Sequence, residues 1–202
     1  MSGIPKAFLE EDEYVDFTDI SISREVAQAI IGCNTEEEKV KAVFEFVRDS
    51  ITNAFDVDAI SIPCTASETV RARVGTDDSK ANLLAAMVRA LGIPAGFCYQ
   101  RLTILDDDSE GHYLHCYNAV YLDGKWIKLD ASTDRGGKKG GFCKITPDLP
   151  FQPRDVYDEC NIPGIFAKPN ETSMQVHRAA EYIEEVMFNL PDKLDMKPDI
   201  KE

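Results

Sequence analysis

The chain has little that would bind an anionic partner. Its 202 residues include 36 Asp and Glu but only 22 Lys and Arg, which leaves a formal net charge of −14 at pH 7. A surface of this sign repels nucleic acids and anionic membranes. No stretch approaches the ~18 consecutive apolar residues that a membrane-spanning helix needs. We therefore expect no nucleic acid partner and no membrane association.

Paired cysteines and an export signal are also missing. The six cysteines stand at positions 33, 64, 98, 116, 143 and 160, and no two have the C-x-x-C spacing of zinc ribbons or thioredoxins. The first ten residues lack a signal-peptide pattern, which predicts a cytoplasmic protein without disulfides. Cys98 and Cys116 lie in predicted strands and are interpreted as small core residues. No cofactor is predicted.

The first half of the chain predicts helices. Two capping boxes, Thr35–Glu38 and Thr65–Glu68, each begin one. The first helix continues to about Ile51 with apolar residues at helical spacing. A third helix runs from about Asp77 to Leu91 and ends at Gly92. Residues 1–34 are predicted to form an N-terminal extension, of which residues 1–25 are acidic and irregular with a short strand around residues 14–17.

The second half predicts antiparallel strands. They span residues 95–103, 113–122 and 125–130, and the last two flank the hairpin turn Asp123-Gly124. A glycine-rich loop at residues 136–141 and an extended, proline-rich stretch at residues 147–169 follow. Helices first and an antiparallel sheet after them indicate an α+β fold with one core. We predict one domain over residues 35–170, and a C-terminal helix (172–190) and tail within residues 171–202.

Three polar residues are expected to meet in this fold. Asp77 begins the third helix, His115 lies in the second strand, and Asp130 ends the third strand. Pairing outward from the Asp123-Gly124 turn sets Asp130 opposite Tyr117, with His115 a diagonal neighbour on the same face. A His115–Asp130 hydrogen bond is therefore predicted.

These segments resemble the transglutaminase-like superfamily, the papain-like group of proteases and acyl transferases. The resemblance covers roughly residues 36–170 and is strongest in 80–102 and 115–130. It implies a papain-like core with helices packed on an antiparallel sheet. It also implies a nucleophile at a helix N-terminus, a histidine on a strand and an acid on the next strand. The catalytic positions would be Asp77, His115 and Asp130, but the family has cysteine where this chain has Asp77.

The aspartate leaves several functions open. The favoured one is a domain without thiol protease or acyl-transfer activity that binds a peptide or protein. The alternative is a hydrolase of changed chemistry, in which Asp77 is the nucleophile, or in which Asp77, His115 and Asp130, with or without Asp78, bind a divalent metal. Catalysis from a displaced thiol, Cys64 or Cys98, is the weakest reading.

Several residues also have purely structural interpretations. Asp77 itself is a good helix N-cap, which would preserve the fold without chemistry. His112 and His177 are predicted to be surface residues. Asn118 is either a site residue or a hydrogen-bonding residue of a strand edge or turn. The sequence does not distinguish a natural Asp77 from an engineered one, and it specifies no oligomeric state.

Overall fold

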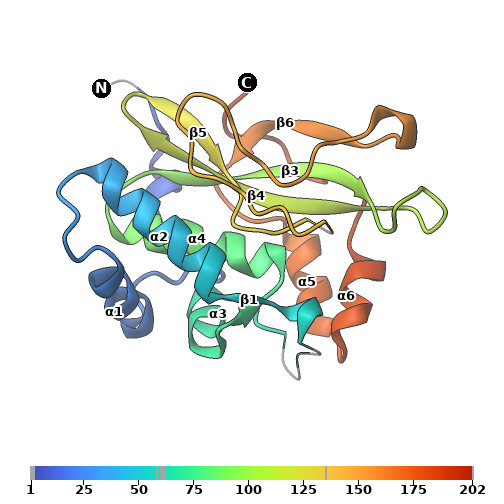
Figure 1. Cartoon of the computed structure of the whole chain (residues 1–202), viewed down its shortest axis with the longest axis horizontal. Helices are drawn as coiled ribbons and strands as arrows, with labels where there is room; N and C mark the ends of the chain where they lie inside the picture. Colours follow the sequence, from blue (N-terminus) through green and yellow to red (C-terminus); the bar gives the residue numbers. More distant parts are fainter. Residues whose placement is uncertain (1–2, 58, 60–61, 135, 202) are drawn as a thin grey trace.

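A computed structural model describes residues 3–57, 59, 62–134 and 136–201. Helices form one layer and a four-stranded antiparallel sheet forms the other, as Figure 1 shows. This arrangement confirms the predicted α+β fold. The first and the last described segments both lie on the sheet side of the molecule (Figure 1).

Both predicted capping boxes are present, with the reciprocal hydrogen bonds that define them. They begin α2 and α3. The third predicted helix is α4, and Gly92 follows its end with φ of +75°, a conformation that favours glycine. The α-helices and the short 3-10 helices (η) are η1 Lys6–Leu9, α1 Ile20–Ala29, α2 Glu36–Ser50, η2 Ala54–Asp56, α3 Ala66–Ala72, α4 Asp77–Ala90, η3 Asp155–Tyr157, α5 Glu171–Ala179 and α6 Ile183–Asn189.

The main sheet has the strand order β5-β4-β3-β6. Asp123 and Gly124 both have positive φ, as a type I′ hairpin turn requires, and the β4–β5 ladder runs outward from them to the pair Asn118–Leu129. A second, two-stranded parallel sheet pairs the residues that follow α2 with those that precede α4. The strands are β1 Thr52–Asn53, β2 Val74–Gly75, β3 Ala95–Thr103, β4 His112–Leu122, β5 Lys125–Leu129 and β6 Cys160–Phe166.

The N-terminal region differs from its prediction. Residues 14–17 form no strand, and α1 begins within residues 1–25, which were expected to be irregular. The Asp19 side chain accepts a hydrogen bond from the Ser21 amide and so caps this helix. Ile22 and Val26 of α1 then join the main hydrophobic core. The pattern was missed because only these two positions of the helix are buried.

The C-terminal half also differs in two places. The stretch 147–169 is not merely extended, because it contains β6, which pairs with the outer side of β3; an edge strand tolerates Pro163. The single predicted helix 172–190 is two helices, broken after α5, where Ala180 has extended backbone dihedrals. The glycine-rich loop is held at its ends by the bridges Thr133–Lys139 and Gly141–Asp148.

Helix α4 is the centre of the molecule. Every residue from Asp78 to Arg89 is buried, because α1, α2 and α3 pack on one side and the sheet on the other. Such a helix brings polar groups into the interior, and each of them needs a partner. Arg89, only 3% exposed, shows how this is met. Its guanidinium donates to the backbone carbonyls of Ala95, Glu10 and Ala167, which joins three segments to the end of α4.

We expect Arg89→Met to destabilise the fold by about 3 kcal/mol, because it leaves these buried carbonyls without donors. A matched control is Lys41→Met, since Lys41 is an exposed helical cation that makes a 4.0 Å contact with Glu45. That change should cost ~0.5 kcal/mol or less. Urea unfolding of both variants measures the difference, and equal midpoints would contradict the role given to Arg89.

Candidate functional site

The site is built at the N-terminus of α4. Thr76 is the N-cap, and its hydroxyl accepts a hydrogen bond from the Ser79 amide. The interpretation of Asp77 as the N-cap is therefore wrong; Asp77 is the first residue of the helix. Because Thr76 caps the helix, the Asp77 side chain is free to turn toward β4. Its carboxylate lies at the positive end of the helix dipole, which favours the ionised form.

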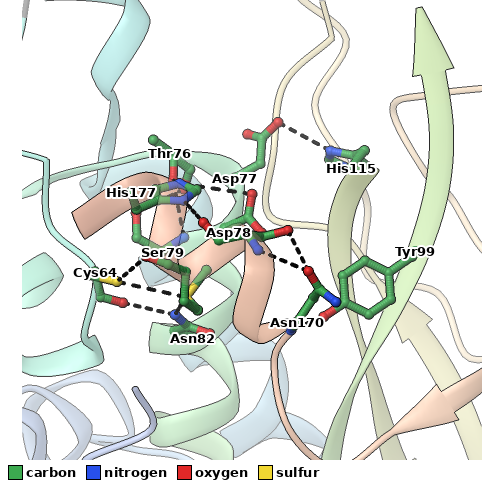
Figure 2. A network of polar contacts seen from close by, with 12 residues as sticks. Cys64, Thr76, Asp77, Asp78, Ser79, Asn82, Tyr99, His115, Asn170 and His177 are labelled. Carbon is green, nitrogen blue, oxygen red and sulfur yellow. Dashed lines mark hydrogen bonds and ion pairs between the residues drawn. The ribbon is translucent and has the colours of Figure 1, made fainter. Parts of the chain in front are cut away.

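The three predicted residues do come together. His115 Nε2 donates to Asp130 Oδ2 at 2.7 Å, and His115 Nδ1 lies 3.2 Å from Asp77 Oδ2. Figure 2 shows the Asp77 carboxylate directed at the imidazole. Asp130 directly follows β5, and its other oxygen accepts the Ser132 amide at 2.9 Å. The three side chains form a row, Asp130–His115–Asp77. The imidazole is fully buried, whereas the Asp77 side chain is 19% exposed, so the row opens to solvent at Asp77.

The charges in this row stabilise one another. Burial alone would lower the pKa of His115, but the carboxylates of Asp130 and Asp77 outweigh it and raise the pKa to about 10. Burial would conversely raise the pKa of Asp77, but the contact with His115, the charge of Lys80 and a hydrogen bond with Ser132 together outweigh it, and the pKa lies below its ordinary value. At neutral pH the site therefore holds an imidazolium between two carboxylates.

Asp78 and Lys80 extend this polar cluster along α4. Asp78 points away from His115, and its Oδ2 lies 4.0 Å from His177 Nε2 (Figure 2). Burial raises the pKa of the Asp78 carboxyl. Lys80 is also buried, which lowers its pKa, while the charges of Asp77 and Asp130 act in the opposite direction. Adjacent acids thus differ: Asp77 is held ionised and Asp78 is pushed toward its neutral form.

His177 was predicted to lie on the surface, and that prediction is wrong. It is buried, its Nδ1 donates to the Ser173 carbonyl at 2.8 Å, and its Nε2 lies 2.8 Å from the Thr76 hydroxyl. It therefore fastens α5 to the N-cap of the helix that carries Asp77. Its spacing from the buried Met174, three residues earlier, was the available signal, because residues three apart share a helix face.

The other two polar residues in question are structural. His112 is half-buried and donates from Nε2 to the Tyr157 carbonyl at 2.7 Å. Asn118 is buried, and its amide donates to the carbonyls of Ala81 and Gly96, which ties α4 to β3 and β4. Neither side chain joins the row formed by Asp77, His115 and Asp130.

A cavity of about 170 Å³ opens at Asp77. Its wall combines apolar side chains, two of them from α6, with polar ones that include four aspartates. A second cavity of about 350 Å³ adjoins it, since Tyr113, Asp134 and Phe151 line both. The smaller cavity is lined by Asn53, Phe55, Asp56, Thr76, Asp77, Asp78, Tyr113, Thr133, Asp134, Phe151, Val186, Met187 and Leu190.

The cysteines offered as displaced nucleophiles lie elsewhere. Cys64 and Cys98 are buried and line neither of these two cavities, and burial raises the pKa of the Cys64 thiol to about 11. Within the described ranges, no group of three or more His, Cys, Asp and Glu side chains is arranged to hold a metal ion. Across the same ranges, no helix is both long enough and apolar enough to cross a bilayer.

The pKa of His115 predicts a pH dependence. Because the folded-state pKa of about 10 exceeds the reference of ~6.5, the stabilisation from this group is full below pH ~6.5 and is lost as the pH rises through 10. Asp77, with a lowered pKa, stabilises the folded state fully above its ordinary pKa of ~3.9. That stabilisation is lost as the pH falls through the lowered pKa.

We expect an NMR titration to show His115 still protonated at pH 8. Asp77→Asn should lower the pKa of His115, because it removes one of the two carboxylates. A His115 pKa below ~6.5 in the unmodified protein would contradict this assignment.

Comparison with known proteins places the chain in a family. A protein-family model described as the transglutaminase-like superfamily matches residues 24–131, and no curated protein matches. Similar solved structures include a provisionally assigned cysteine protease from Cytophaga hutchinsonii (22% identity, TM-score 0.49, 61% of this chain and 40% of that one). A provisionally assigned protease from Parabacteroides distasonis has 22% identity and a TM-score of 0.38 over 55% of this chain and 23% of that one. A structure described as a TGase has 16% identity and a TM-score of 0.41, over 69% of this chain and 37% of that one.

This chain therefore spans less than half the length of the solved proteins that it resembles. The family model nevertheless covers more than half of the chain, from within α1 to just beyond Asp130. The protein belongs to the transglutaminase-like superfamily.

Proposed function

We propose that this protein is a transglutaminase-like domain without thiol chemistry, which binds a peptide or protein segment in the cleft at Asp77. The observation that carries the proposal is the row formed by Asp130, His115 and Asp77, with distances of 2.7 and 3.2 Å and a fully buried imidazole. It preserves the charge arrangement of a thiolate–imidazolium pair but places a carboxylate where the nucleophile belongs.

The replacement removes the reactivity of the pair. A thiolate beside an imidazolium is a strong nucleophile and a good leaving group from an acyl-enzyme. The Asp77 carboxylate has its pKa lowered by His115, and the helix dipole stabilises it further, so it is a weak nucleophile. Attack on an amide would also form an acyl anhydride, which needs a separate means of hydrolysis.

A hydrolase with Asp77 as the nucleophile is the alternative that we considered, and the electrostatics oppose it. Releasing an ester intermediate requires a base that takes a proton from water. His115 is the nearest imidazole, and with a pKa of about 10 it already carries its proton at neutral pH. A binding role needs no such proton transfer.

The cleft suits a chain-like ligand. The cavity at Asp77 and the adjoining cavity lie side by side, since Tyr113 and Phe151 line both. Aromatic and aliphatic residues of the wall would bury apolar side chains of the ligand, while Asp56 and Asp134 line the cavity at Asp77. The formal net charge of −14 favours a cationic segment.

The first test is turnover by the unmodified chain. We expect no iodoacetamide-sensitive hydrolysis or transamidation of casein or of a glutamine-containing peptide, because no described cysteine lies in the row. Thiol-dependent turnover would overturn the proposal and direct attention to Cys64 or Cys98. Binding is measured separately, by fluorescence anisotropy with a library of labelled cationic and anionic peptides.

The second test restores the thiol. In Asp77→Cys the new side chain should have a pKa below the ~8.5 of a free cysteine, because His115 and the helix N-terminus both favour the thiolate. At pH 6 its alkylation should be about tenfold or more faster than in Asp77→Cys combined with His115→Ala. Equal, slow rates in the two variants would show that the row does not activate a nucleophile.

A further inference from the structure

The first half of β4 has one side that the sheet does not cover. Strand β5 pairs with β4 only from Leu122 back to Asn118. Beyond that point the backbone of residues 112–117 keeps its pairing with β3 but loses its β5 neighbour. The amide of Leu114 belongs to this open side, immediately before His115. It donates at 2.8 Å to the carbonyl of Pro191.

Pro191 belongs to a C-terminal segment that lies across the site. Val186, Met187 and Leu190 of this segment line the cavity at Asp77. One residue past Pro191, the carboxylate of Asp192 pairs with Arg101 of β3 at 3.4 Å. Residues 183–192 thus occupy the cleft much as an external chain would, with apolar side chains in the cavity and a backbone hydrogen bond to the open side of β4.

This segment is held less firmly than the helix before it. Helix α5 has a side-chain N-cap, Asn170, and His177 anchors it in the interior. Helix α6 has no side-chain cap, and only Ile183 and Val186 of its seven residues are buried. On its outer side Tyr182 is 65% exposed and Phe188 56%. Helix α6, which covers the cleft, therefore has weaker anchors than α5, and weak anchoring favours local opening.

We propose that residues 183–192 form an intramolecular strap that fills the ligand cleft and is displaced by an extended peptide, which then pairs with the Leu114 amide. The identity of the ligand rests on the proposed function. The opening of the strap does not, because it is a property of the free chain and can be measured without a ligand.

Hydrogen exchange followed by NMR tests the opening in the unmodified protein. The amide of Leu114 should exchange at least about tenfold faster than that of Ala119, which lies between β3 and β5, and with little dependence on denaturant. Leu114 protection equal to that of Ala119, with the same denaturant dependence, would overturn the strap.

A reporter thiol tests the same point independently. In the Asp77→Cys background, alkylation is measured at pH 8.5, where a thiol is ionised without help from His115. Adding Leu190→Asp places a charge in the apolar wall and should raise the rate about tenfold, whereas Phe188→Asp, on the exposed side of the same helix, should not change it. Equal rates in the two variants would mean that the strap does not limit access.

A third experiment measures peptide binding, with an unstructured, lysine-containing decapeptide that also has apolar residues as the probe. If it binds, Leu190→Asp should tighten binding relative to Phe188→Asp, because the competing strap is weakened. Tighter binding in Phe188→Asp would contradict the proposal. Fast Leu114 exchange with no binding by any peptide would refute the proposed function and leave the strap standing.

Discussion

The site depends on one imidazolium held between two carboxylates. Burying His115 completely would normally favour its neutral form, and burying Asp77 would favour the neutral carboxyl. Because Asp77 and Asp130 flank the imidazole, the pKa of His115 is raised and that of Asp77 is lowered, so both of these groups stay ionised inside the protein. The position next to His115 therefore suits a negative charge, and the Asp77 carboxylate provides it.

The fold serves mainly to fix the two ends of that row. Asp77 is placed by the first turn of α4, which is buried along its length and capped by Thr76. His115 and Asp130 are placed by the Asp123-Gly124 hairpin, whose tight turn sets the β4–β5 register. Asn118, in between, donates to α4 and β3 and so couples the helix to the sheet. A change at Thr76, at the hairpin turn or at Asn118 would alter the distances between the charged groups and, with them, the pKa values of Asp77 and His115.

Much of this could be predicted because it is local. The capping boxes, the Gly92 helix end and the Asp-Gly turn each depend on a few neighbouring residues, and the turn alone fixed the His115–Asp130 pairing. Features that depend on distant contacts were missed. Strand β6 exists because β3 offers it an edge, α1 exists as a packed helix because Ile22 and Val26 meet the core, and His177 is buried only because α5 folds back on Thr76.

The C-terminal region, which contains β6 and His177, shapes the site. Helices α5 and α6 and strand β6 lie beyond residue 131, where the family model ends, yet His177 fastens the N-cap of α4 and residues 186–190 close the cavity. The core therefore supplies the row of charges, and the C-terminal region determines what can reach it. In a catalytic relative such a cover would hinder substrate entry at every turnover. If Asp77 has replaced the nucleophile, as we propose, the cover costs no catalysis, and exchange of the cover for an external chain would make the cleft a selective binding site.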